Sequence, residues 1–188
     1  MPDKADVVNL ERFSKGLTYQ EYVNQIKSNK DQFDKNYGEF KLKEEDKQSF
    51  QELVQRRGPI RVLVLGEDWC PDVYRGVPVM ARIAEEAGLD MRVFPRDQNH
   101  DIMNFYLNHG QFMSIPTIVF FDKDFTELGH WIERAKAATE FMTKVRDELT
   151  KSGKSEEEIR AESRRRNQEM WDTWRQEQVR ELKELLKA

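Results

Sequence analysis

A chain of 188 residues, of which 35% are charged and whose mean hydropathy is -0.85, predicts one modest core with extensions and much solvated surface. Its net charge of -4 gives no basic footprint for nucleic acid, so no nucleic-acid partner is expected. The sequence has a single cysteine, an N-terminus without an apolar signal core and apolar runs too short to span a bilayer. These features predict a cytoplasmic protein with no membrane association.

Residues 1–57 are predicted to form a helical extension that packs on the core. The first 16 residues show little hydrophobic periodicity and are expected to be mostly irregular. Aromatic side chains recur along the rest of the extension, and helical aromatics pack on a neighbouring domain more often than they form a binding surface. The helices expected here are residues 18–28, which follow the capping box Thr18-x-x-Glu21, residues 31–37, which Gly38 stops, and residues 44–57.

A buried strand and a helix are predicted to meet at the only cysteine, Cys70. The apolar residues of the stretch 60–65 are nearly continuous and rich in β-branched side chains, which predicts a strand buried on both faces. Residues 71–87 carry apolar side chains at helical spacing. Cys70 therefore belongs at a helix N-terminus, where unpartnered backbone N–H groups favour a thiolate. The alternative is an inert buried thiol, against which the neighbouring Trp69 and the strand-to-helix junction argue.

The following segments predict that the sheet continues after this helix. Two of the strands are joined by a short polar turn, so they are expected to pair as an antiparallel hairpin. The predicted order is therefore strand, helix, strand, helix, strand, strand, helix, which is an α/β arrangement with a central mixed sheet flanked by helices. The expected elements are a strand at residues 91–94, a helix at 100–108 capped by Asn99, strands at 117–121 and 127–132, and a helix at 135–150.

Residues 152–188 are predicted to form one long charged helix that begins at the capping box Ser155-x-x-Glu158. Its apolar stripe is confined to the second half, so this part is expected to dock on the N-terminal helices or on a second subunit, which would make a homodimer through the C-terminal helix. The triplet Arg164-Arg165-Arg166 fits an acidic partner, a phosphate or a solvated helix face. The acidic residues around it favour the solvated face.

Three motifs resemble the thioredoxin family. The sequence Trp69-Cys70-Pro71-Asp72-Val73 is similar to the family's Trp-Cys-Pro-Asp-Cys active site, with the second cysteine replaced by Val73. Pro78 matches the proline that kinks the family's active-site helix, and Ser114-Ile115-Pro116-Thr117 is similar to the family's Ile-Pro-Thr turn into a strand. The resemblance covers residues 58–151 and implies a thioredoxin-like fold. It also implies that the Ile115–Pro116 bond is cis, faces Cys70 and offers backbone groups to an extended substrate.

Two departures from the family limit the chemistry that the resemblance implies. Val73 has no thiol to resolve a mixed disulfide, so release needs an external thiol such as glutathione. The family's buried aspartate falls at Val64 and its partner lysine near Val93, so both proton-relay groups are absent. The Asp72 carboxylate either opposes a Cys70 thiolate or serves as a favourable charge at the helix N-terminus.

Three functions remain open on this sequence. The first is a monothiol thiol-disulfide oxidoreductase, with Cys70 as nucleophile, residues 71–73 as the turn that faces the sulfur, Ile115 and Pro116 as substrate-binding residues, and protein or small-molecule thiols and disulfides as partners. The second is a non-catalytic binding or assembly module on the same fold. The third is a metal or iron–sulfur site that Cys70 shares with an external thiol. The three histidines have no ligand spacing, so no metal site and no resident cofactor are predicted.

Overall fold

The computed structural model describes residues 2–188 and has at its centre a four-stranded sheet in the order β2-β1-β3-β4. β1 (Arg61–Gly66) runs parallel to β2 (Asp90–Pro95) and antiparallel to β3 (Thr117–Phe121), which pairs antiparallel with β4 (Glu127–Ile132). The two central strands are buried along their length because nearly all of their side chains are apolar. This is the thioredoxin-like arrangement that the motifs predict.

Helix α6 (Pro71–Ala87) connects the parallel strands β1 and β2, and it has the predicted bounds. Pro71 takes the first helical position, where its missing N–H costs nothing, and Gly88 ends the helix in the left-handed conformation at φ 77°. Ten of the helix's 17 residues are buried, so it is packed on several sides. The helices α4 (Lys30–Glu39) and α5 (Glu44–Arg57) pack on its outer surface.

The N-terminal extension contains more helix than its sequence predicts. Residues 4–14 form two short helices, α1 (Lys4–Val7) and α2 (Leu10–Ser14), which the Asp3 and Asn9 side chains cap, so the expectation of an irregular segment is wrong. The prediction that Gly38 stops a helix is also wrong, because α4 continues to Glu39. A glycine inside a helix costs only about 1 kcal/mol, and burial of Phe33 and Phe40 offsets that cost. The predicted helix after the Thr18 capping box is α3 (Tyr19–Gln25).

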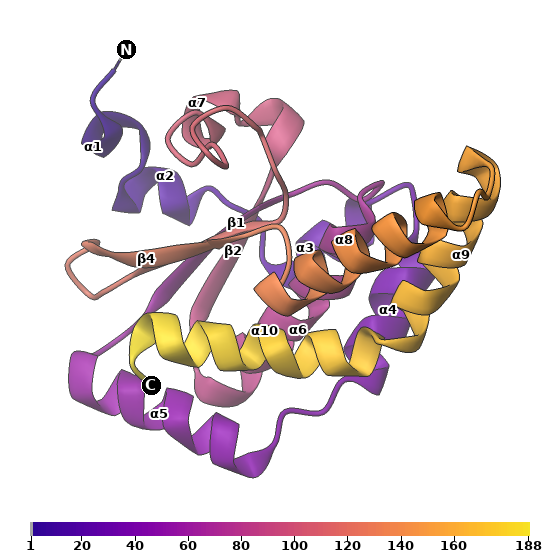
Figure 1. Ribbon diagram of the computed structural model, residues 1–188. Coiled ribbons are helices and arrows are strands. Elements are labelled where there is room, and N and C mark those ends of the chain that lie inside the picture. The colour runs from indigo at the N-terminus through magenta and orange to yellow at the C-terminus, as the bar shows by residue number, and fades with distance from the viewer. Residues whose placement is uncertain (1) are drawn as a thin grey trace.

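The segment after β2 is also less helical than predicted. It forms a 3-10 turn η1 (Arg96–Gln98) and a four-residue helix α7 (His100–Met103), not a helix to residue 108. Asn99 does not cap this helix with its side chain, which instead donates to the Pro95 carbonyl and accepts from Arg12. Arg12 also pairs with Asp101, so α2 is held against α7. In Figure 1 these segments lie above the sheet, whereas α5, α6 and α10 lie below it.

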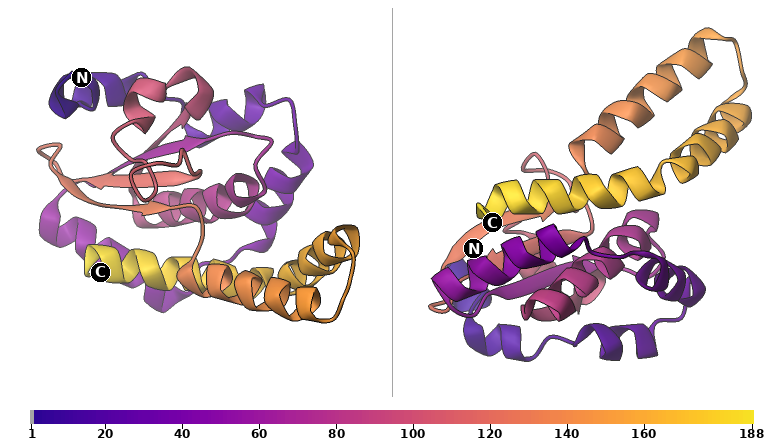
Figure 2. Two further views of the ribbon diagram at one scale, coloured as in Figure 1. Left: turned by 45° about the horizontal axis from the view of Figure 1, so that its top comes forward. Right: turned by 90° about the horizontal axis from the view of Figure 1, so that it is seen from below.

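The C-terminal region forms three helices, α8 (Lys136–Lys151), α9 (Glu156–Glu169) and α10 (Trp171–Leu186). The prediction of one continuous helix after Ser155 is wrong, because the chain turns at Met170. α8 and α9 pair with each other over a small separate core of Phe141, Val145, Leu149 and Ile159. Figure 2 shows this pair, the helical arm, projecting from the body.

Helix α10, rather than α8, covers the sheet on the side of β4. It packs on α5, α6 and β4 through its apolar stripe, with Val179, Leu182 and Leu186 buried. The predicted docking on an N-terminal helix is therefore found within the chain, while a homodimer through this helix stays a prediction. Among residues 2–188, no helix combines the length and the apolar composition that crossing a bilayer requires.

Truncating the α10 side chain at the centre of this contact should destabilise the protein. Leu182 is fully buried, and Leu182→Ala is expected to lower the free energy of unfolding by about 2–5 kcal/mol through lost burial and a residual cavity. Urea unfolding followed by circular dichroism measures the change. The control is Thr173→Ala, at an exposed position on the same helix, and equal stability of the two variants would contradict the packing of α10.

Candidate functional site

Cys70 occupies the N-cap position of α6, directly after the turn that leaves β1. Its sulfur lies 3.7 Å from the carbonyl oxygen of Ile115, and the Ile115–Pro116 peptide bond is cis. The cysteine is 9% exposed, so the sulfur is less accessible than the neighbouring exposed Trp69 suggests. The structure therefore brings Cys70 and the Ile115–Pro116 loop together, but it places the sulfur in a largely dry environment.

Burial is the main influence on the protonation of this thiol. It raises the pKa of Cys70 above the ordinary thiol value, because removal from water disfavours the charged form. The backbone N–H groups of Val73 and Asp72 lower the pKa, as expected at a helix N-terminus, but they do not overcome burial. The contact with the Ile115 carbonyl also needs the protonated form, since only S–H donates a hydrogen bond. The helix N-terminus thus favours the thiolate as expected, but burial outweighs it in the pKa of Cys70.

Asp72 links the first turn of α6 to the segment after β4. Its carboxylate accepts a hydrogen bond from Arg134 at 2.6 Å and lies 4.0 Å from Arg75. Burial raises the pKa of the Asp72 carboxyl, and the two arginines oppose that shift. The Asp72 charge in turn raises the pKa of Cys70, whereas Arg134 lowers it. Asp72 is therefore both a helix N-terminal charge and a partner of two arginines.

The positions of the family's proton-relay residues are apolar and adjacent. Val64 on β1 and Val93 on β2 are partners in the strand register, and both are fully buried. Val73, at the position of the resolving cysteine, is fully buried as well. The described chain thus has no buried acid at this place that could transfer a proton to or from Cys70.

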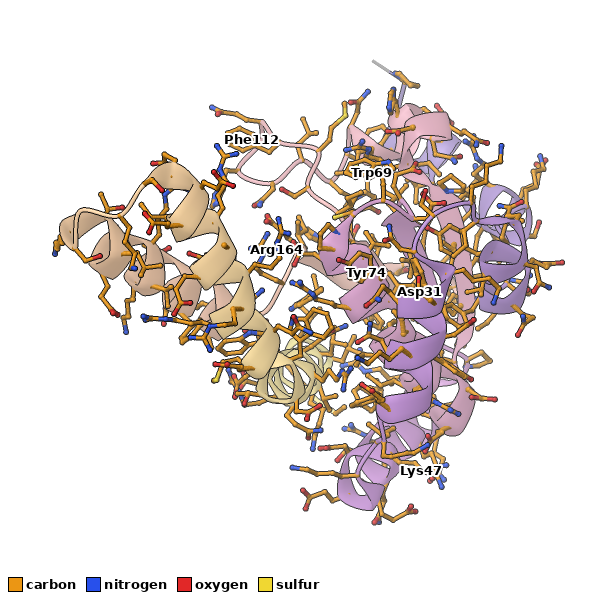
Figure 3. All side chains as sticks on the ribbon, turned by 90° about the vertical axis from the view of Figure 1, so that its right-hand side faces the viewer. Asp31, Lys47, Trp69, Tyr74, Phe112 and Arg164 are labelled. Carbon is orange, nitrogen blue, oxygen red and sulfur yellow. The ribbon has the colours of Figure 1, made fainter. Side chains whose placement is uncertain are left out.

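Three exposed apolar side chains, here called the apolar rim, lie close in sequence to the site: Trp69 directly precedes Cys70, and Phe112 and Met113 lie three and two residues before Ile115. Trp69 is 52% exposed and Phe112 is 59% exposed. Arg96 connects the two sides of the rim, because its guanidinium lies 5.3 Å from the Trp69 ring and donates to the Met113 carbonyl at 3.1 Å. Figure 3 shows Trp69 and Phe112 on the same side of the molecule.

Four residues of the site region are not predicted from the sequence: Arg75 and Arg134, which pair with Asp72, and Phe112 and Met113 of the apolar rim. Arg75 lies one turn after Asp72, so the spacing itself was a signal for their ion pair. Arg134 lies 62 positions away, and no local pattern indicates that the end of β4 returns to the α6 N-terminus. Across residues 2–188 there is no group of three or more His, Cys, Asp and Glu side chains placed to hold a metal ion.

Comparison with known proteins gives a family and two structural relatives. The sequence model of a family described as Thioredoxin matches residues 16–154. A protein of unknown function from Pseudomonas aeruginosa is similar over 100% of this chain and 98% of its own, with a TM-score of 0.67 and 16% sequence identity. An HIV epitope-scaffold is similar over 69% of this chain and 79% of its own, with a TM-score of 0.57 and 21% identity. No curated protein matches the chain significantly.

These comparisons confirm the predicted thioredoxin-like fold, and at such identities the structural likenesses carry information on the fold alone. The family match begins well before residue 58, so it includes most of the N-terminal helices. It ends at residue 154, before α9 and α10 begin.

Removing the Asp72 charge should make Cys70 more reactive. Because the carboxylate raises the pKa of the thiol, Asp72→Asn is expected to lower that pKa and to increase the rate of iodoacetamide alkylation at pH 8. The control is Asp68→Asn, which removes a carboxylate at the same distance in sequence. Asp68 accepts hydrogen bonds from the backbone N–H groups of Lys27 and Ser28. An alkylation rate that rises equally in both variants, or in neither, would contradict the role of Asp72.

Proposed function

The chain belongs to the thioredoxin family, and on that premise we propose that it exchanges thiols and disulfides through the single sulfur of Cys70. The observation that carries the proposal is the position of that sulfur, 3.7 Å from the carbonyl oxygen of Ile115 in the cis-proline loop and at the N-terminus of α6. A partner chain that pairs with this loop brings its own sulfur to Cys70. The apolar rim, whose Trp69 directly precedes Cys70, offers a surface for such a partner.

The proposed reaction has two steps and needs an external thiol. First, the Cys70 thiolate attacks a disulfide of the partner, so that a mixed disulfide forms and one partner sulfur leaves as a thiolate. Second, the thiolate of a small thiol such as glutathione attacks the mixed disulfide, takes over the partner sulfur and releases the Cys70 thiolate. With valine at position 73, no second step within the chain is available. The small thiol is thus the electron donor of the reaction.

The environment of Cys70 also favours a second candidate function, which is a binding or assembly module without redox activity. Cys70 is 9% exposed and burial raises its pKa, both of which slow attack by the thiol. The apolar rim would serve such a module equally well. The two functions differ in whether Cys70 forms and releases a mixed disulfide.

Reaction with oxidised glutathione separates the two functions. The monothiol proposal predicts that Cys70 forms a glutathione mixed disulfide and that added reduced glutathione releases it, which intact-mass spectrometry and a thiol assay measure. Its alkylation rate should increase with pH around a midpoint above that of an ordinary thiol, because burial raises the pKa. Cys70→Ser gives the background. If the wild-type protein is folded and its sulfur forms no mixed disulfide in a day, the thiol-exchange proposal is wrong. The binding module is then the remaining candidate function.

Restoring the second cysteine tests whether the site has lost only its resolving thiol. Val73 lies in the first turn of α6, three residues after Cys70. Val73→Cys is expected to form an internal disulfide on oxidation and to gain reduction of protein disulfides with dithiothreitol as donor. The control, Val77→Cys, places a thiol one turn further along the same helix. A folded Val73→Cys variant that keeps both thiols free under oxidising conditions would mean that the turn does not allow the exchange.

A further inference from the structure

Two adjoining hollows lie beside the first turns of α6, on the side of the helical arm. The inner cavity, of about 40 Å³, lies between α6, the segment after β4 and α10. The arginine cleft, of about 570 Å³, lies between α6, α8 and α9. The two hollows share part of their lining. The residues that line both are Asp72, Arg75, Arg134, Met142 and Asn167.

Four residues that line the inner cavity each carry a buried N–H donor without an acceptor. These donors have no partner within residues 2–188, although an unsatisfied buried donor costs about 1–3 kcal/mol. Arg175 is the most enclosed, with a side chain that is 7% exposed. All of these groups are donors, so their common partner is rich in acceptors. They are the Nε atoms of Arg75, Arg134 and Arg175 and the indole Nε1 of Trp171.

The charge of the lining points to an anion. Six arginines line the two hollows, in a chain whose net charge is -4. Four of them are paired with carboxylates, so the excess of positive charge comes from the remaining two. Within the described part of the chain, Arg160 and Arg164 of α9 have no carboxylate within 4 Å, whereas most other arginines do. The cleft therefore holds uncompensated positive charge.

The structure divides the arginine triplet of α9 into two roles. Arg165 pairs with Glu162 and Glu169 on the solvated face that the sequence favours. Arg166 is half-buried and pairs with Glu162 and with Glu148 of α8, across the helical arm. Arg164 instead lines the arginine cleft, and Figure 3 shows it between the helical arm and the body.

We propose that the inner cavity and the arginine cleft form a binding site for a small phosphorylated anion, with a phosphoryl group in the inner cavity. The four unpartnered donors come from α6, the segment after β4 and α10, and thus from different sides. A tetrahedral oxyanion presents acceptors in all directions, whereas a carboxylate presents them along one edge. The cavity has room for a few water-sized atoms, which is about the size of a phosphoryl group. The rest of the ligand extends into the cleft toward Arg160 and Arg164.

This site depends on the part of the chain that follows the family match. Trp171, Arg175, Arg160 and Arg164 all lie after residue 154, so helices α9 and α10 supply the outer wall and two of the four inner donors. The proposal does not depend on thiol exchange at Cys70, and its test reads binding alone.

Titration calorimetry of the full chain with inorganic phosphate and with pyrophosphate tests the proposal, with citrate and glutathione as carboxylate ligands of similar size. We expect pyrophosphate to bind more tightly than citrate or glutathione and to weaken as salt is added. Arg164→Gln and Trp171→Phe are each expected to weaken pyrophosphate binding about tenfold, because the first removes a positive charge from the cleft and the second removes one donor to a charged group. Trp171→Phe keeps an aromatic ring below the Arg75 guanidinium, which lies 4.2 Å from the Trp171 ring.

The matched control is Arg165→Gln, which removes the same charge from the adjacent position but outside the cleft. Affinity like that of the wild type in Arg165→Gln, with loss in Arg164→Gln and Trp171→Phe, supports the site. No binding of pyrophosphate at millimolar concentration, an equal loss in Arg164→Gln and Arg165→Gln, or tighter binding of citrate or glutathione would overturn it. Arg164 is exposed, so its substitution leaves the fold intact even if Trp171→Phe is unstable.

Discussion

The close packing of α10 on α6 at Gly76 is the contact on which the arrangement of the C-terminal half depends. Gln178 of α10 donates a hydrogen bond to the Gly76 carbonyl at 3.0 Å, and both groups are buried. A Cβ atom at Gly76 would lie 3.3 Å from the Gln178 side chain, which is tighter than an ordinary contact, so the absence of a side chain eases the close approach of α10 to α6. The same Cβ atom would be in ordinary contact with Pro116, at 3.6 Å. Because α10 takes this face of the sheet, α8 pairs with α9 in the helical arm, and the two hollows lie between the arm and the body.

At Cys70 two physical effects oppose each other, and their sizes decide the outcome. A helix N-terminus stabilises a nearby negative charge by about 0.3–1 kcal/mol, and by up to about 2 kcal/mol in partly buried sites. Burial of a charge can shift a pKa by several units. The sulfur is nearly enclosed and an additional carboxylate, Asp72, raises its pKa further, so burial prevails and the pKa of the thiol is raised. The position in the sequence correctly indicated the helix terminus but carried no information on enclosure.

The sequence predicted best those elements that local chemistry defines. The bounds of α5, α6, β3 and β4 follow from apolar periodicity and from end signals such as Pro71 and Gly88, and the structure has the same bounds. The errors lie where distant contacts decide. Gly38 lies inside a helix that buried aromatic side chains hold in place. The chain turns at Met170 because α9 packs on α8, whereas α10 packs on the body of the protein beside β4. The ion pair of Asp72 with Arg134 was inaccessible for the same reason, since it joins residues that only the folded sheet brings together.

Arg134 and Asp72 line the two hollows and also influence the pKa of Cys70. Arg134 lowers the pKa of Cys70, and Arg75 also interacts with the sulfur's charge. An oxyanion bound to these arginines adds negative charge near the sulfur and offsets their effect on its pKa. The two proposed sites therefore oppose each other. A bound anion raises the pKa of the thiol, and a Cys70 thiolate weakens anion binding by the same factor. The two proposed sites share the first turns of α6, so the proposals together predict that an anion in the inner cavity lowers the reactivity of Cys70.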